Sequence, residues 1–157
     1  MIYYIVKNVD TRQKVVFQTG ELEKTITRGE AVLWKIKSTF PFDPLPDELI
    51  VDRHKISLIK RPFFFSERVT SLSYDDISNV VIEHSMVFAS LEISHKIFGM
   101  QPLTMHYLRK KEADKVKQLI LGLIIAKKEG NKEIFSLSRQ ELIKKASELG
   151  RARIVGQ

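Results

Sequence analysis

The sequence contains no cysteine among its 157 residues. Disulfide bonds, thiolate metal ligands and a cysteine nucleophile are therefore excluded, which suits a reducing compartment. The chain also lacks a long apolar run. The longest one, from Leu119 to Ala126, has eight residues, whereas a membrane-spanning helix needs about 20. Lys7 interrupts the apolar N-terminal stretch too early for a signal peptide, so we expect a soluble, cytoplasmic protein.

Surplus charge is absent from the first two thirds of the chain. Residues 1–108 contain 13 Lys and Arg against 13 Asp and Glu, whereas residues 109–157 contain 13 against 6, which accounts for the whole net charge of +7. A nucleic-acid-binding sheet would carry this surplus on its strands, which is not the case here. Nucleic-acid binding through the basic C-terminal helices remains an alternative that we do not favour. Phe135 is also the sole aromatic residue after Tyr107 that could stack on a base.

What the sequence does contain is a series of short strand-like runs between Glu30 and Gly130, followed by one long helical pattern. Alternating or β-branched segments bounded by turn residues predict strands. The predicted strands span residues 31–38, 48–53, 55–61, 67–73, 79–84, 88–95 and 102–108. Three prolines within Phe40–Pro46 exclude a helix or a central strand there and predict a stiff loop.

Two helices are predicted after the strands. From Lys111 to Lys128, apolar residues recur at spacings of three and four, and Gly130 follows as a stop. Ser138–Glu141 has the S-x-x-E spacing of a capping box and begins a second helix, which Gly150 should end. Residues 151–157 would then form a loose basic tail.

This order of elements predicts an α+β fold in which a small antiparallel barrel is closed at one end by the long helix. We divide the chain into an N-terminal extension with a predicted hairpin (1–29), the barrel with its capping helix (30–130), and a C-terminal helix with a basic tail (131–157). Barrels of this kind mostly bind other molecules and seldom catalyse reactions.

Several segments resemble the bacterial pleckstrin-homology-like (PH-like) proteins, a branch that is mostly uncharacterised. The segments are Phe40–Asp43, Pro46–Arg53, Lys55–Ile59, Asp75–Val80 and Tyr107–Ala113. The resemblance covers roughly residues 30–130. It implies a barrel of about seven strands in two near-orthogonal sheets, with the C-terminal helix plugging one open end. It also implies lipid binding, protein binding or self-assembly.

The same resemblance suggests a first candidate anion site. Phosphoinositide-binding members place Lys and Arg around the loop between the first two strands, and Lys35, Lys37 and Arg53 could approach that arrangement. The loop itself departs from the family pattern, because Phe40–Pro46 contains one acid and no cation.

A second candidate anion site is Arg109, Lys110 and Lys111, at the start of the long helix. Cations there are unfavourable by about 0.3–1 kcal/mol each, because the unpaired N–H groups of a helix N-terminus already carry partial positive charge. An external anion would offset that cost. We favour the local acids Glu112 and Asp114 as the compensation.

Phe40, Phe42 and Leu45 are apolar residues in a loop that should be polar. We favour an arrangement in which they fold back over a barrel end. The alternative is an exposed apolar tip for a membrane surface or a partner.

The C-terminal half of the long helix is apolar on nearly every side, and a barrel end covers only one. Leu121 and Ile125 lie away from the main stripe, and Leu142, Ile143 and Leu149 of the second helix could cover them. The short connection favours packing within one chain. The same helix donated by a neighbour would instead produce a homo-oligomer.

Few residues are arranged for chemistry. His84, His95 and His106 recur at regular intervals, which would suit zinc only if the strand register placed them on one face. Asp75 and Asp76 suit a turn better than a catalytic pair. Gly-rich phosphate loops, nucleophile elbows and zinc-binding helix pairs are missing from the sequence. We predict no enzyme activity, no cofactor and no metal, and rank a small hydrolase or metal-dependent enzyme last.

We therefore predict a non-catalytic binding or assembly module. A protein partner or self-association is the favoured reading. An anionic membrane surface is the alternative, in which case the protein would be peripheral to the membrane. We infer no small-molecule substrate.

Overall fold

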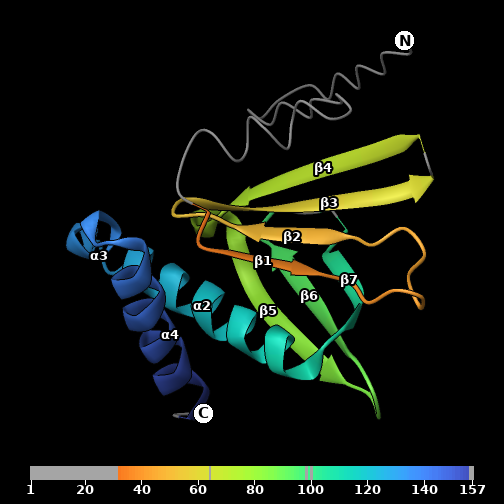
Figure 1. The fold of residues 1–157 in the computed structure, drawn as a ribbon. Helices are drawn as coiled ribbons and strands as arrows, with labels where there is room; N and C mark the ends of the chain where they lie inside the picture. The colour runs from red at the N-terminus through yellow and green to blue at the C-terminus, as the bar shows by residue number, and fades with distance from the viewer. Residues whose placement is uncertain (1–31, 64, 98, 100, 156–157) are drawn as a thin grey trace, which may run out of the picture.

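The computed structural model describes residues 32–63, 65–97, 99 and 101–155. The hairpin predicted within residues 1–29 lies outside these ranges. Over the described residues, seven strands precede three α-helices (Figure 1). This order confirms the α+β fold class that the sequence predicts.

The strands form two antiparallel sheets. The first contains β1 (Trp34–Lys37), β2 (Glu48–Val51), β3 (Lys55–Phe63) and β4 (Ser66–Ser73), side by side in chain order. The second contains β5 (Ile77–His84), β6 (Ala89–His95) and β7 (Leu103–Leu108). Side chains of both sheets point into one shared core, which includes Leu49, Leu58 and Leu91. Pro62 does not end β3, but the pairing with β4 shifts register between Lys60 and Phe63.

The two sheets are not closed into a barrel, so the predicted closure was wrong. In the described residues, pairing stops at β4 on one sheet and resumes at β5 on the other. The 3-10 helix η1 (Tyr74–Asp76) turns the chain between them. Tyr74 is fully buried, and its hydroxyl donates to the carbonyl oxygens of Asp52 and Lys55. Burial raises the pKa of Tyr74 well above its ordinary value, so this anchoring hydroxyl stays protonated.

The helix α2 (Lys110–Lys128) covers the core between the sheets and confirms the longest helix that the sequence predicts. Its periodic residues Ala113, Val116 and Ile120 are fully buried, and it contacts β1, β5, β6 and η1. Gly130 has a φ of 67° and follows the helix end, as its left-handed preference predicts.

The connection after α2 contains a short helix that the sequence analysis missed, α3 (Lys132–Ser136), with Asn131 as its N-cap. Next comes α4 (Arg139–Val155), which packs along α2 (Figure 1). The predicted capping box is present, because the backbone N–H of Ser138 donates to Glu141 at 3.3 Å and the N–H of Glu141 donates to the Ser138 hydroxyl at 3.4 Å.

Gly150 does not end the second helix, and residues 151–155 are helical rather than a loose tail, so both predictions were wrong. Gly150 stands inside the helix because α2 and α4 pack too closely there for a side chain. A Cβ atom on Gly150 would lie 1.9 Å from the carbonyl oxygen of Gln118, and one on Gly122 would lie 1.7 Å from that of Ala146. The two glycines therefore allow the α2 and α4 backbones to touch.

Candidate binding surface

One end of the two sheets carries a concentration of exposed apolar side chains. The β1–β2 loop, the β3–β4 hairpin and the end of β7 lie toward the right of Figure 1, and the β5–β6 hairpin extends toward its lower edge. The exposed apolar residues of these segments are Phe40, Phe42, Phe63, Phe65, Met86, Val87 and Tyr107. We call these seven residues the apolar rim. In the described part of the chain, Ile97 and Ile154 are the other large apolar residues with exposed side chains.

Phe42 joins the β1–β2 loop to the second sheet. Its ring centroid lies 4.8 Å from that of Phe88 and 6.4 Å from that of Tyr107. The backbone N–H of Thr39 also donates to the carbonyl oxygen of Tyr107, at 2.9 Å. The loop is therefore docked on the end of β7, although the two sheets share no ladder in the described residues.

Tyr107 occupies a left-handed backbone conformation, with a φ of 56°. This region is uncommon for a residue with a Cβ atom and costs roughly 1–2 kcal/mol. Strained residues of this kind are concentrated at functional sites. The strain here coincides with the point where the β1–β2 loop, the β5–β6 hairpin and α2 converge.

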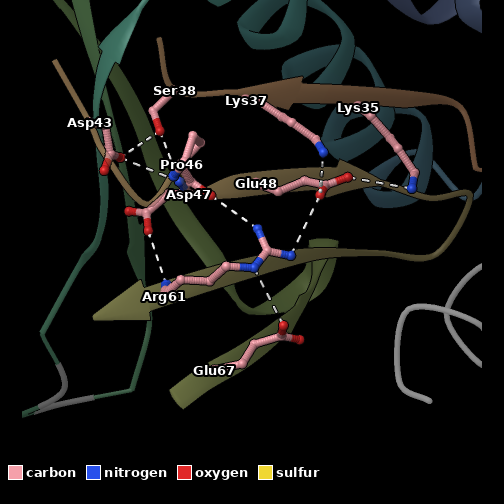
Figure 2. Close-up of polar contacts among 9 residues, drawn as sticks. All are labelled: Lys35, Lys37, Ser38, Asp43, Pro46, Asp47, Glu48, Arg61 and Glu67. Atoms are coloured by element: carbon pink, nitrogen blue, oxygen red, sulfur yellow. Dashed lines mark hydrogen bonds and ion pairs between the residues drawn. The ribbon is translucent and has the colours of Figure 1, made fainter. Parts of the chain in front are cut away.

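A polar network holds the β1–β2 loop in place (Figure 2). The Ser38 hydroxyl donates to the Asp43 carboxylate at 2.5 Å, and the backbone N–H of Leu45 donates to the same carboxylate at 3.2 Å. The N–H of Asp47 donates to the Ser38 hydroxyl at 2.8 Å. Asp47 in turn accepts from the backbone N–H of Arg61 on β3, and burial raises the pKa of Asp47 above its ordinary value.

This network explains why Phe40 does not fold back over the sheets as we favoured, although Phe42 contacts Phe88 and Tyr107 of the second sheet. Phe40 is 70% exposed and Phe42 is 58% exposed, whereas Leu45 is partly buried. Because Asp43 fixes the loop from within, the two phenylalanines on its outer side remain in solvent.

The second predicted cation cluster lies beside the apolar rim. Arg109, Lys110 and Lys111 directly follow β7, and the Lys110 ammonium donates to the carbonyl oxygen of Met86 at 2.8 Å. Of the two local acids, Glu112 pairs with Arg109 at 3.7 Å. Asp114 instead lies 3.2 Å from His84. Within the described residues, the local compensation that we favoured therefore includes an ion pair for Arg109, which is still 71% exposed.

The first predicted cation cluster is brought together only in part, because Arg53 lies apart from Lys35 and Lys37. Lys35 and Lys37 point to the outer face of the first sheet, where both pair with the buried Glu48 at 3.4 and 3.3 Å (Figure 2). Arg53 lies in the β2–β3 turn and donates to the carbonyl oxygen of Phe135 at 2.6 Å, which ties that turn to α3. Sequence reasoning missed Glu48, although its place opposite Lys37 follows from the strand pairing.

Of the predicted helix contacts, two lie on α2 and three on α4, and these two helices pack on each other. Leu142 is fully buried, whereas Leu121, Ile125, Ile143 and Leu149 are partly buried. The α4 helix therefore covers α2 within a single chain. Arg139, at the start of α4, also donates to the carbonyl oxygens of residues 32 and 33 and so links α4 to the edge of the first sheet.

The histidines are dispersed. His84 contacts Asp114, His95 contacts the carbonyl oxygen of Gln101, and His106 contacts the Ser90 hydroxyl at 3.0 Å. No group of three metal-ligating side chains is found within the described ranges.

Asp75 and Asp76 form the turn η1, as predicted. Asp75 lies 3.8 Å from Lys127 on α2, and the carbonyl oxygen of Asp76 accepts from the backbone N–H of Lys96.

A shallow cavity of about 260 Å³ lies next to the apolar rim. It is lined by Ser85, Phe88, Ser90, His106 and Tyr107. Of the four residues whose convergence would have indicated an enzyme (His84, His95, His106 and Asp76), this cavity contains His106 alone.

The sequence matches no known family model, and no curated protein is detectably similar to it. No helix in the described residues is both long enough and apolar enough to cross a membrane.

Proposed function

We propose that this protein is a non-catalytic, PH-like binding module that docks its apolar rim and the neighbouring cations onto an anionic membrane surface. The observation that carries the proposal is a set of exposed apolar side chains on three loops and β7, of which those of the β5–β6 hairpin lie beside Lys110. Two antiparallel sheets followed by a C-terminal helix agree with a PH-like arrangement at the coarse level.

The shape of the rim favours a bilayer over a protein partner. Its most exposed side chains stand on loop tips, up to 97% exposed for Met86, and Tyr107 borders the shallow cavity beside the rim. A well-packed protein interface needs complementary shape, whereas a fluid bilayer accepts any apolar tip. Apolar insertion and electrostatic attraction together are the usual basis of peripheral membrane binding. Each Lys or Arg near an anionic surface contributes about 1 kcal/mol.

The sequence argument for self-association depended on an uncovered apolar face of α2. The sequence suggested a homo-oligomer only if a neighbour donated the helix that covers α2. In the structure α4 provides that cover in cis, with Leu142 fully buried against α2.

Vesicle sedimentation tests the proposal. The intact protein should sediment with vesicles that contain phosphatidylserine, more weakly with neutral phosphatidylcholine vesicles, and less as salt rises. The double substitution Phe40→Ser/Met86→Ser should weaken binding at least tenfold, because a fully buried Phe or Met contributes about 1.5–3 kcal/mol.

The matched control is Ile97→Ser/Ile154→Ser, which removes two exposed apolar side chains outside the rim. This control should bind like the wild type. Equal loss in both variants, or binding to neither kind of vesicle, would remove the membrane proposal. Binding to a protein and to neither vesicle would favour the other class of partner.

A further inference from the structure

A cleft of about 470 Å³ lies between α3 and α4, which stand to the left of the two sheets in Figure 1. Ligand-binding pockets usually have volumes of about 300–1,000 Å³. Both helices and the turn between them contribute apolar side chains to the cleft, namely Ile134, Leu137, Leu149 and Ala152. Ile134 is buried, Leu137 and Leu149 are partly buried, and Ala152 is exposed. The cleft therefore has an apolar floor that is accessible from solvent.

Three charged side chains border this cleft, Glu133 of α3 and Lys145 and Glu148 of α4. Hydrogen bonds from Ser138, together with the nearby charge of Lys145, lower the pKa of Glu141, so this cation already has an acid beside it. Among the described residues, neither Glu133 nor Glu148 has an ion-pair partner for its carboxylate. The cleft therefore presents two uncompensated acids in the third of the chain that carries the whole surplus of positive charge.

Both walls of the cleft are fixed to the body of the protein. On the α3 side, Arg53 donates to the carbonyl oxygen of Phe135 at 2.6 Å, and the ring of His54 stacks on that of Phe135 with centroids 6.0 Å apart. On the α4 side, the backbone contact at Gly150 and the hydrogen bonds of Arg139 hold the helix in place. Walls that are already ordered lose little conformational entropy when a ligand binds, which favours affinity.

We infer that this cleft binds a basic amphipathic helix of a protein partner. Such a helix places apolar side chains at spacings of three and four residues into a groove. Its Lys and Arg residues lie against Glu133 and Glu148, so the charges of the two surfaces are complementary. An acidic segment would instead meet two carboxylates. The cleft is separate from the apolar rim, and with both surfaces occupied the protein links a membrane surface to a second protein.

Fluorescence anisotropy tests this inference with the full chain and a labelled synthetic peptide. The peptide contains about 14 Leu and Lys residues, or four helical turns, with Leu at helical spacing. The protein should bind it roughly tenfold or more tightly than the matching peptide in which Glu replaces every Lys. Equal binding of the two peptides, or binding of neither, would overturn the inference.

Charge reversal locates the binding site. Glu133→Lys/Glu148→Lys should weaken binding of the Leu–Lys peptide roughly tenfold or more and strengthen binding of the Leu–Glu peptide. The control Glu83→Lys/Glu92→Lys makes the same change in net charge on β5 and β6, and it should bind both peptides like the wild type. Equal losses in the two variants would mean that net charge, rather than the cleft, attracts the peptide, and would contradict the inference.

A steric block provides an independent readout. Ala152→Trp fills the cleft from an exposed position and should weaken binding of the Leu–Lys peptide roughly tenfold or more, whereas Ala152→Ser should not. Urea unfolding should show that both variants are as stable as the wild type, as expected for an exposed site. Peptide binding that survives Ala152→Trp would place the site elsewhere and overturn the inference.

Light scattering without peptide tests the alternative occupant, a second copy of the chain. A wild-type dimer that Ala152→Trp converts to a monomer would show that a neighbouring copy fills the cleft, and would overturn the inference. A wild-type monomer that binds the Leu–Lys peptide supports it. These assays contain no lipid, so their outcome is separate from that of vesicle binding.

Discussion

Apolar side chains are covered at the α2–α4 end of the molecule and exposed at the opposite end. At the α2–α4 end, Gly122 and Gly150 allow two backbones to meet, and the apolar residues between them are covered. At the other end, Asp43 and Ser38 hold a loop so that Phe40 and Phe42 stay exposed. Covered apolar surface stabilises the fold, whereas exposed apolar surface fixed by a polar network is available for a partner. The comparison predicts stability effects at one end and binding effects at the other.

The largest effect on stability should come from Gly150→Ala. Helix propensity alone would make this change stabilising by about 1 kcal/mol. The structure predicts the opposite sign, because the new Cβ atom would lie 1.9 Å from the Gln118 carbonyl oxygen. Overpacking of this kind costs about 1–3 kcal/mol. Urea unfolding measures the difference, and Lys144→Ala, at an exposed position of α4, is the control. A more stable Gly150→Ala protein would refute the close packing.

At the rim end, Phe63→Ser/Phe65→Ser should leave stability within about 0.5 kcal/mol, as expected for exposed sites. The two side chains are 74% and 95% exposed. Binding to anionic vesicles should fall by about 100-fold or more, because two inserted phenylalanines contribute about 3 kcal/mol or more. Sedimentation and unfolding are measured on the same samples. Unchanged binding would show that Phe63 and Phe65 do not take part in membrane binding.

The cations beside the rim should have a smaller effect. Arg109→Gln/Lys111→Gln should weaken binding to anionic vesicles about 30-fold at low salt, at about 1 kcal/mol per cation. The change should shrink as salt rises. Lys128→Gln/Arg151→Gln removes the same charge from the α2–α4 end and is the control. Equal losses in both variants would mean that net charge, rather than its position, attracts the protein.

The smallest effect concerns the network that holds the β1–β2 loop. Burial raises the pKa of Asp47 above its ordinary value of 3.8. A raised pKa in the folded state means that protonated Asp47 favours folding. This contribution is present at low pH and is lost as pH rises through the pKa of the folded state. Asp47→Asn should therefore remove this loss of stability with rising pH over the acidic range. Urea midpoints from about pH 3 to about pH 7 measure it, and parallel profiles for both proteins would argue against this assignment.

Local patterns in the sequence were sufficient to predict the strands and the long helix. The spacing of Ala113, Val116 and Ile120 predicts a helical face, and the prolines of Phe40–Pro46 predict a loop. Both are properties of neighbouring residues. Barrel closure depends instead on which distant strands pair, and the Tyr74 anchor to Asp52 that turns the chain at η1 spans 22 residues.

The candidate site was harder to predict for the same reason. Phe40 and Phe42 were identified as a candidate tip, but their exposure depends on the internal hydrogen bonds of Asp43. Met86 and Val87 were not predicted as part of the surface, because nothing in their local sequence shows that the β5–β6 hairpin lies beside the β1–β2 loop. Gly150 was predicted to end the helix, because the sequence alone does not distinguish a glycine that ends a helix from one that allows two helix backbones to touch.

Partition of the wild-type protein between anionic and neutral vesicles tests the central claim most directly. Sedimentation with the phosphatidylserine-containing vesicles that falls with salt and is lost in Phe40→Ser/Met86→Ser, but retained in Ile97→Ser/Ile154→Ser, is the predicted result. A protein that remains in the supernatant with both kinds of vesicle, even at low salt, would contradict the claim.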